Sequence, residues 1–568
     1  MPKTKIVCTI GPASESPEIL RELILAGMNV ARLNFSHGTH GEHKEKIDRL
    51  RMLSDELKRP IAILQDLCGP KIRVGSIPSP GLELKPGQSL ILTTEEIVAE
   101  GNKVHVSYQN LPSDVRVGDR LLLADGLMEI VVRKTWGHEV TCEVITGGVL
   151  TSNKGINMPT GTLKAPSLTE KDKTDLIFGL DCDVDYVALS FVRSAADIHA
   201  IKAIISDHGK TTPVIAKIEK HEAVENIDEI LQATDGIMVA RGDLGVEIPL
   251  DRVPYIQKKL VHKANEAGKP VIIATQMLRS MVASPRPTRA EAADVANGVL
   301  DGADAIMLSE ETASGEYPVT AVEFMVRIAD SAEDHYPHQK YLAMLKATSV
   351  SKSVAHAACT LAEQLDAAAV VATTRSGATA KHISHFRPSA PIVALSPDQG
   401  AVRELCLYWG CLPSFQSVKH DNDELIDTAP RMALETEYVA PGPDGPRNRV
   451  RGPRRSRRHH RRTLHHVREG YHRFGVGNHI EKIATRAFLR WKLLKEETVG
   501  FIRRQEEKFA RQLLQWQYEK DGQAVPDLAT LQHRARLLVD DAHRIARQRG
   551  GNILTILKEA VGKGKGPR

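Results

Sequence analysis

The sequence has no apolar run that approaches the about 20 residues a membrane-spanning helix requires. No apolar signal region precedes its first strand-like segment, KIVCTI, and its seven cysteines show neither disulfide nor metal-ligand spacing. The net charge of +5 is small for 568 residues, so no chain-wide nucleic-acid signature is present. We therefore expect a cytoplasmic protein of several domains, without membrane segments, in a reducing compartment.

One short segment places charges at the end of an otherwise apolar run, PVIAKIE at Pro213–Glu219. The apolar run is typical of a strand covered on both faces, as in a parallel sheet flanked by helices. Lys217 and Glu219 alternate with Ile218, so both side chains point to one side, about 6–7 Å apart along the strand. Together they could hold a metal ion and a transferring phosphoryl group; the alternative is a structural ion pair.

Strand-like and helix-like segments alternate over the first two-thirds of the chain. The expected strands are Lys5–Ile10, Val30–Ser36, Ile61–Leu67, Val184–Phe191, Pro213–Glu219, Gly236–Leu244, Pro270–Gln276 and Ala305–Glu311. Expected helices between them include Ser16–Gly27, His40–Leu57, Ala195–His208 and Pro254–Gly268. Eight strands with crossover helices predict an α/β fold of the (β/α)8, or TIM-barrel, type.

The gap between the third and fourth strands, from Leu67 to Val184, is too long for a loop. It contains short alternating segments, LKPGQSLILTT, VRVGDRLLLADG and MEIVVRKTW, separated by turn signals. We expect a small antiparallel β domain, inserted after the third barrel strand, where a lid over the site could be attached.

Polar residues follow the predicted barrel strands consistently. They are Arg32, Asn34 and Ser36 at the second strand, Asp66, Lys71 and Arg73 at and after the third, Arg241, Gly242 and Asp243 at the sixth, Thr275 and Gln276 at the seventh, and Ser309–Thr312 at the eighth. The carboxyl ends of barrel strands meet at one mouth, where barrel enzymes keep their active sites, so these groups should converge. Basic groups with carboxylates and hydroxyls suit a phosphorylated anionic substrate and a divalent metal.

Several segments together resemble the pyruvate kinase family, from the first residues to about Pro441. These segments are VARLNFSHG, KIE, GIMVARGDLGVEIP, KPVIIATQML and SPRPTRAEAADVANGVLDGADAIMLSEETASGEYP. The resemblance implies phosphoryl transfer from phosphoenolpyruvate to ADP, giving pyruvate and ATP in glycolysis, by a homotetramer. It also implies a barrel (1–69 and 166–343), a lid with a β-barrel fold (70–165) and a C-terminal α/β domain (344–440), which is incomplete here.

The resemblance further implies roles for individual residues around the phosphoryl group. Glu219 and Asp243 would bind Mg²⁺ or Mn²⁺, which needs few protein ligands. Lys217 would stabilise the charge of the transferring group, and Arg32 and Arg73 would contact phosphate oxygens.

Other residues would bind the rest of the two substrates. Thr275 would contact the substrate carboxylate and steer the proton that converts enolate to pyruvate, and the backbone at Gly242 can approach the substrate because no side chain intervenes. Lys154 would reach the nucleotide from the lid, with Asn34 and His37 on the barrel side. For His37 the alternative is a surface-loop histidine.

One departure from the family pattern concerns K⁺. Members that need K⁺ carry a glutamate where this chain has Lys71, whereas the other ligands of the ion, Asn34, Ser36, Asp66 and the carbonyl of Leu67, are present. The ammonium of Lys71 could supply the positive charge that K⁺ otherwise brings. We therefore expect activity with little or no K⁺ requirement.

A second α/β unit follows residue 351, with a helix at Ser353–Leu365, a strand AAAVVATT, a turn and a strand APIVALS. The turn contains Thr374, Arg375, Ser376, Gly377 and Thr379. A Ser/Gly/Thr turn before a helix N-terminus is typical of phosphate binding, and in the resembled family this loop binds phosphorylated allosteric effectors. The alternative is a plain connection.

The resemblance breaks at Pro441–Gly475, which has eleven Arg, five His and no Lys. One interpretation is an arginine-rich arm that contacts nucleic acid or acidic partners; the other, which we favour, is a shift of reading frame. Residues 476–568 then predict a helical extension, with helical spacing at Leu528–Arg547 and Asn552–Val561. We expect a working kinase without a nucleic-acid partner; the alternative is an impaired or moonlighting fusion whose basic tail binds nucleic acid or protein.

Overall fold

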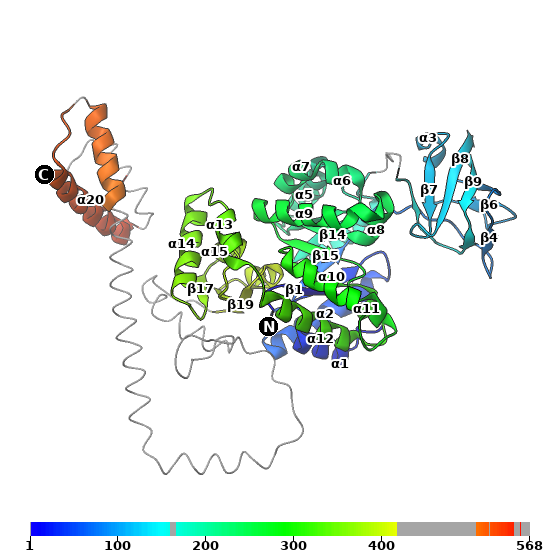
Figure 1. Cartoon of the computed structure of the whole chain (residues 1–568), viewed down its shortest axis with the longest axis horizontal. Helices are drawn as coiled ribbons and strands as arrows, with labels where there is room; N and C mark the ends of the chain where they lie inside the picture. Colours follow the sequence, from blue (N-terminus) through cyan, green and yellow to red (C-terminus); the bar gives the residue numbers. More distant parts are fainter. Residues whose placement is uncertain (1, 160–165, 417–506, 522, 550–556, 558–568) are drawn as a thin grey trace, which may run out of the picture. The chain divides into compact units, whose positions relative to one another are not determined.

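The computed structural model of the chain describes residues 2–159, 166–416, 507–521, 523–549 and 557 (Figure 1). The chain divides into two compact units, Met1–Arg454 and Arg455–Arg568. Among the described residues, no helix is both long enough and apolar enough to cross a membrane.

Eight parallel strands close a barrel in the first unit, in the order β1-β16-β15-β14-β13-β12-β3-β2. They are β1 (Lys5–Thr9), β2 (Val30–Asn34), β3 (Ala62–Asp66), β12 (Tyr186–Leu189), β13 (Val214–Ile218), β14 (Gly236–Ala240), β15 (Val271–Ala274) and β16 (Ala305–Leu308). Each strand lies inside one of the predicted strands, so the prediction of a TIM barrel is confirmed.

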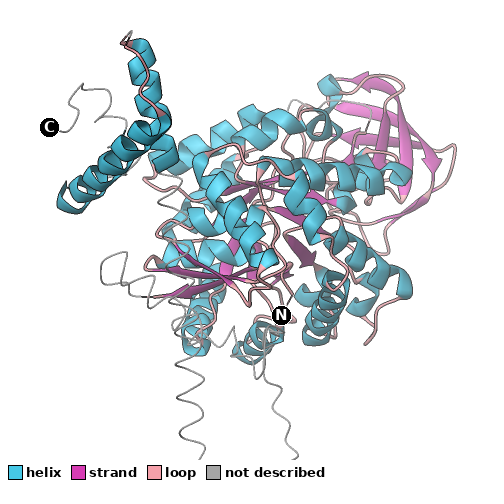
Figure 2. Cartoon of the chain, turned by 60° about the vertical axis from the view of Figure 1, so that its left-hand side comes forward, coloured by secondary structure: helices cyan, strands magenta, loops and turns pink. Residues whose placement is uncertain are grey.

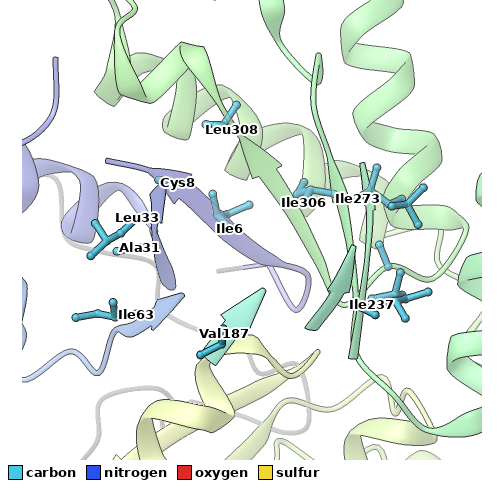
Figure 3. Close-up of a cluster of buried hydrophobic side chains, with 14 of the residues drawn as sticks. Ile6, Cys8, Ala31, Leu33, Ile63, Val187, Ile237, Ile273, Ile306 and Leu308 are labelled. Carbon is cyan, nitrogen blue, oxygen red and sulfur yellow. The ribbon is translucent and has the colours of Figure 1, made fainter. Parts of the chain in front are cut away.

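Alternate residues of the barrel strands pack into two different cores. Val7, Leu64 and Ile215 belong to the inner cluster that fills the barrel. Ile6 and Cys8, on the opposite face of β1, pack in the layer between the strands and the surrounding helices, together with the other residues labelled in Figure 3. Because both faces are buried, the strands read as continuous apolar runs.

Helices surround the strands of the barrel (Figure 2). They are α1 (Pro17–Ala26), α2 (His40–Leu57), α4 (Glu170–Asp181), α5 (Ala195–Asp207), α6 (His221–Glu225), α7 (Ile227–Ala233), α8 (Arg241–Glu247), α9 (Val253–Ala267), α10 (Arg289–Leu300), α11 (Glu310–Ala313) and α12 (Pro318–Glu333). Local signals fix their ends. Thr39 and Glu42 form a capping box at the start of α2, and Gly268 ends α9 in the left-handed conformation.

The sixth predicted strand, Gly236–Leu244, is too long. The strand ends at Ala240, and Arg241–Glu247 forms α8. The apolar run stops at Ala240, and the Thr275 hydroxyl accepts the N–H of Gly242, which satisfies one free amide of the first helical turn. Asp243 therefore lies on a helix and not on a strand.

The inserted lid is built from β4 (Leu82–Leu84), β5 (Ser89–Thr93), β6 (Lys103–His105), α3 (Leu111–Asp114), β7 (Arg120–Leu123), β8 (Met128–Trp136), β9 (Glu139–Thr146), β10 (Gly148–Leu150) and β11 (Ile156–Asn157). Its larger sheet runs β11-β7-β8-β9-β5-β6, around a core of its own. The insertion after β3 is confirmed. The prediction of a purely antiparallel lid is wrong for one pair, because β5 and β6 are parallel, so the sheet is mixed.

The C-terminal domain contains α13 (His338–Met344), α14 (Val350–Gln364), β17 (Val370–Thr373), α15 (Ala378–His385), β18 (Ile392–Ser396), α16 (Gln399–Glu404) and β19 (Cys411–Phe415). β17, β18 and β19 form a parallel sheet. The helix and the first two strands follow the prediction, whereas β19 was not predicted. The arginine-rich segment Pro441–Gly475 lies outside the described residues.

Buried polar contacts attach the C-terminal domain to the amino end of the barrel. The guanidinium of Arg387, 2% exposed, donates to both carboxylate oxygens of Asp304 at 2.8 Å. The hydroxyl of Tyr186 donates to the Glu404 carbonyl at 2.6 Å, and Cys406 joins the inner barrel core. The two domains therefore share buried surface at the end opposite the mouth.

The second unit contains a helix at 507–520 and α20 (Leu528–Arg549). Ala510, Ala535 and Val539 are buried together where these two helices pack. The predicted helix at Leu528–Arg547 is confirmed. Most of the predicted helix Asn552–Val561 lies outside the described residues.

Candidate active site

Lys217, at the carboxyl end of β13, is the centre of a buried cluster drawn from three strands. Its ammonium lies 2.8 Å from Glu219 Oε1 and 3.1 Å from Asp66 Oδ1, and it donates to the Ser190 hydroxyl at 2.6 Å. Burial alone would lower the pKa of Lys217, but Asp66 and Glu219 outweigh it and raise that pKa. Lys217 therefore carries a fixed positive charge. It contacts two carboxylates and a hydroxyl, so it does not form a simple structural ion pair with Glu219 alone.

Asp66, at the end of β3, connects Lys217 to Arg32 on β2. Arg32 Nε donates to Asp66 Oδ2 at 2.6 Å, and Arg32 Nη1 donates to the Thr9 hydroxyl at 3.0 Å. Asp66 is 1% exposed, and burial alone would raise its pKa. The positive charges of Lys217 and Arg32 lower it instead, so the carboxylate stays ionised between two cations.

Glu219 and Asp243 are the candidate metal ligands. Glu219 Oε2 accepts the N–H of Phe191 at 2.9 Å. Burial raises the pKa of Glu219, and the charge of Asp243 raises it further, against the opposing effect of Lys217. The two carboxylates thus repel each other, and a divalent cation between them would relieve that repulsion, so the residues fit Mg²⁺.

The described residues contain no group of three or more His, Cys, Asp or Glu side chains placed to hold a metal ion. The protein would therefore supply Mg²⁺ with two carboxylates and leave its other positions to water and substrate oxygens. This is the usual arrangement for Mg²⁺ in phosphoryl-transfer sites.

Thr275 has a strained backbone at the end of β15, with φ +71°, which is unusual for a β-branched residue. Arg241 holds it there: Arg241 Nη2 donates to the Thr275 carbonyl at 2.6 Å, while Arg241 Nη1 pairs with Asp294 at 2.7 Å. The Thr275 hydroxyl accepts the Gly242 N–H at 2.8 Å. Strain of this kind points to function, and here it fixes a hydroxyl beside the helix that carries Asp243.

The lid adds cations to the site. Lys71 Nζ lies 3.5 Å from Asp243 Oδ1, and Arg73 donates to the Asn153 carbonyl at 2.9 Å. Partial burial lowers the pKa of His37, and the charges of Arg73, Arg32 and Lys71 lower it further. His37 is therefore close to cations of both the lid and the barrel.

Lys154 is exposed on the lid, in the turn before β11, and its carbonyl accepts the N–H of Val74 at 2.9 Å. A cavity of about 490 Å³ lies between the lid and the barrel, with Lys71, Asn157 and Arg193 among the residues that line it. Its position beside Lys71 leaves room for a ligand next to the strand ends.

Three of the four predicted K⁺ ligands, Asn34, Asp66 and Leu67, already have protein partners for their oxygens. Asn34 Oδ1 accepts the N–H of Ser36 at 3.1 Å, and the Leu67 carbonyl accepts the Ser190 hydroxyl at 2.7 Å. Within the described part of the chain, the ion pairs of Lys71 are with Asp243 and Asp125, and none joins it to Asp66. The ammonium of Lys71 is thus placed beside the candidate metal ligand and not among those four residues.

The predicted effector loop connects β17 to α15. Arg375, Ser376 and Thr379 are exposed, Thr374 is buried, and Gly377 caps the helix with φ +79°. The loop therefore presents hydroxyls and one guanidinium to solvent at a helix N-terminus.

Two residues of the site were missed by the sequence reasoning. The Ser190 hydroxyl accepts a hydrogen bond from the Lys217 ammonium and donates one to the Leu67 carbonyl. Ser190 directly follows β12 (Tyr186–Leu189). The polar residues predicted for the mouth included none from this strand, so the strand-end pattern could have identified Ser190. Arg241 was seen at a strand end without a role, and nothing in the sequence signals its contact with Thr275.

Comparisons with known proteins agree with this geometry. The profile of the pyruvate kinase barrel domain matches residues 1–322, and that of the pyruvate kinase alpha/beta domain matches residues 352–444. Pyruvate kinase 2 of Synechocystis sp. is 48% identical over 446 residues, which cover 78% of this chain and 75% of the relative. The pyruvate kinases of Clostridium acetobutylicum (45% over 447 residues; 78% and 94% covered) and Staphylococcus haemolyticus (46% over 449 residues; 78% and 76% covered) are similar. The predicted resemblance is confirmed: the chain belongs to the pyruvate kinase family of phosphotransferases.

Proposed function

We propose that this chain transfers the phosphoryl group of phosphoenolpyruvate to ADP, forming pyruvate and ATP, with Lys217 as the central cation. The observation that supports this most is the cluster of Lys217, Arg32 and two sets of carboxylates at one mouth of the barrel. Phosphoryl transfer depends on positioned positive charge more than on covalent chemistry, and the cluster supplies such charge without further rearrangement.

The side chains divide this work between them. Lys217 and Arg32 bind the oxygens of the transferring group, and Asp66 keeps both cations oriented toward the mouth. Glu219 and Asp243 hold the divalent metal, which, when bound, neutralises charge on the substrate oxygens. The Gly242 backbone and the Thr275 hydroxyl bind the substrate carboxylate, and Thr275 directs the proton that turns enolate into pyruvate.

The nucleotide binds on the lid side. Arg73 and Lys154 contact its phosphates, and Asn34 and His37 contact it from the barrel. The cations gathered around His37 support this placement, because they form a positive surface between barrel and lid. A neutral His37 can donate a hydrogen bond there without adding charge.

The reaction proceeds with little or no K⁺. The fixed ammonium of Lys71, 3.5 Å from Asp243, already brings a positive charge into the site. Full activity in K⁺-free tetramethylammonium buffer supports this statement, and strong activation by added K⁺ contradicts it.

The chain assembles with copies of itself, as a tetramer. One face of α14 carries Val350, Val354 and Leu361, and Leu365 follows at the C-cap of the helix; each is between 48% and 69% exposed within the described residues. Their spacing puts them in one stripe of the helix, and a contiguous apolar stripe on a soluble enzyme marks a contact surface. The mass of the purified chain by light scattering tests this.

The loop from Thr374 to Thr379 binds a phosphorylated effector, supported by its exposed hydroxyls, Arg375 and the helix N-terminus behind them.

The domain limits are those given above: 1–69 and 166–343, 70–165 and 344–440. These statements all depend on catalysis by the barrel, so the first experiment measures pyruvate formation from phosphoenolpyruvate, ADP and Mg²⁺. Activity that needs all three supports the proposal, and its absence in the folded chain contradicts it.

A further inference from the structure

A second, smaller cavity lies at the other end of the barrel, where α9 ends against α15. Its empty volume, counted together with the open space at its mouth, is about 230 Å³. Lys269, from the barrel, and Lys381 and Arg387, from the C-terminal domain, line it. A ligand held here would touch both domains.

Two buried polar atoms of this cavity have no hydrogen-bond partner in the described residues. They are Arg387 Nε and His385 Nδ1, on side chains that are 2% and 8% exposed. A Cβ built on Gly268, which is left-handed at φ +71°, would lie 3.2 Å from His385 Nδ1 and 3.6 Å from Lys352 Nζ. The absence of that Cβ keeps the space in front of His385 Nδ1 and Lys352 Nζ open. Buried polar atoms left unpaired are costly, so a ligand that pairs them gains affinity.

The charge around the cavity is positive. Arg387 is neutralised by Asp304 and Lys381 by Glu404, at 2.8 Å and 2.7 Å. Lys269 donates to the Thr234 carbonyl at 2.8 Å, and within the described ranges neither it nor Lys352 forms an ion pair. Burial lowers the pKa of Lys269. The charge of Asp235 opposes this effect, and the charges of Lys202, Lys352 and Lys381 lower the pKa further. An anion would relieve this mutual repulsion.

His385 adds selectivity to this positive site. Burial, with the charges of Lys352, Arg387 and His382, lowers its pKa to about 4, so the ring is neutral near pH 7. A hydrogen bond to the Asn265 backbone raises its pKa, as a donated N–H would, so the free Nδ1 is an acceptor. The cavity therefore offers several donors and one acceptor.

We propose that this cavity binds inorganic phosphate as the hydrogenphosphate ion, whose oxygens accept from Lys269, Lys352 and Arg387 Nε and whose hydroxyl donates to His385 Nδ1. Sulfate and methyl phosphate carry two negative charges at pH 8 but no hydroxyl, so they leave Nδ1 unpaired. The bound ion bridges the barrel and the C-terminal domain, which stabilises their contact.

Calorimetric titration of the full chain with sodium phosphate, sodium sulfate and methyl phosphate at pH 8 tests this. We expect phosphate to bind at this site about tenfold more tightly than the other two, the effect of one well-made buried hydrogen bond. Lys269→Gln and Lys352→Gln should each weaken phosphate about tenfold, because each removes a charge-assisted contact. These changes should not affect phosphate that binds at the barrel mouth. The difference in phosphate affinity between the wild type and each variant therefore reports on binding in the cavity alone.

Lys202→Gln is the matched control, because Lys202 is nearby but paired with Asp235 at 2.8 Å. It should bind phosphate as the wild type does. Within the described residues the side chain of Lys352, on α14, forms no hydrogen bond or ion pair, so its variant keeps the test valid if Lys269→Gln does not fold. Unchanged phosphate binding in Lys352→Gln overturns the site. Equal binding of sulfate or of methyl phosphate overturns the role of His385, because neither ion has a hydroxyl that can donate to Nδ1.

Discussion

Replacement of Lys217 by Met removes an ammonium that contacts residues at the ends of three strands. Met has nearly the volume of the lysine stem, so the change removes charge and leaves packing largely intact. A single cation that stabilises a transferring phosphoryl group accounts for about 10³–10⁵-fold in kcat. We expect a loss of that size, equivalent to about 4–7 kcal/mol of transition-state stabilisation, in steady-state pyruvate formation at saturating substrates.

The same change also costs stability, with a defined pH dependence. Loss of one partner of a buried ion pair costs about 3–5 kcal/mol when the other charge remains. Asp66 keeps Arg32 at 2.6 Å, but within the described residues Glu219, 1% exposed, is left with only the Phe191 N–H as a hydrogen-bond donor. The folded-state pKa of Glu219, already raised by burial and Asp243, rises further, so the folded protein binds a proton that the unfolded chain releases. The variant should therefore lose stability as pH rises above the usual range of a glutamate, and chemical denaturation at pH 5 and pH 8 measures this.

Lys220→Met is a matched control. Lys220 and Lys217 both have side chains 11% exposed, and each pairs with a buried glutamate, Glu247 at 2.7 Å and Glu219 at 2.8 Å. The two variants should lose similar stability, whereas Lys220→Met should keep kcat within about tenfold, since it leaves the phosphoryl-binding cations in place. A Lys217→Met enzyme that is folded and retains more than a tenth of wild-type kcat would refute the role given to Lys217.

Three further changes test other parts of the site and fold. Lys71→Glu should make the enzyme depend on K⁺, seen as activation by KCl over tetramethylammonium chloride that the wild type lacks; equal K⁺ response in both contradicts the exchange. Arg241→Gln should lower kcat about 10²-fold with little change in KM, because it frees the strained backbone of Thr275 and displaces its hydroxyl; an equal rise in KM would indicate substrate binding instead. Folding lowers the pKa of His385 to about 4. Between pH 6.5 and pH 4 the histidine is therefore protonated in the unfolded chain but neutral in the folded one, so the free energy of unfolding falls by up to about 1.4 kcal/mol per pH unit as the pH drops. His385→Gln should flatten that slope in acid denaturation, and an unchanged slope would show that His385 titrates normally.

The barrel and the positions of its polar ends could be predicted because they depend on short-range patterns. Buried parallel strands are largely apolar, and polar residues at the carboxyl end of each run mark the mouth, as Lys217 and Asp66 do. The apolar run of β14 stops at Ala240, but the helix that begins at Arg241 could not be predicted in this way. The chain turns into α8 there because Thr275, on a different strand, accepts the Gly242 amide, and a local pattern carries no signal of that contact.

Contacts between distant residues explain the other differences. Lys217 contacts Ser190, and Arg387 contacts Asp304, although the two residues of each pair are far apart in the sequence. A periodic pattern along the chain does not reveal such contacts. The parallel pairing of β5 with β6 depends on how the connection between them crosses the sheet, while alternation alone does not distinguish parallel from antiparallel neighbours. The sequence predicts that Lys71 replaces K⁺, but it does not predict the contact of Lys71 with Asp243, which depends on how the lid and the barrel are placed in three dimensions.

The central claim is that the mouth built around Lys217, Glu219 and Asp243 moves a phosphoryl group from phosphoenolpyruvate to ADP. Phosphorus NMR of the purified full chain follows the phosphoryl group itself. With Mg²⁺ and without K⁺, the signal of phosphoenolpyruvate should be replaced one for one by the γ-phosphate of ATP, and Asp243→Asn should abolish the exchange. Release of free phosphate in place of ATP, or no turnover by the folded chain, would contradict the account.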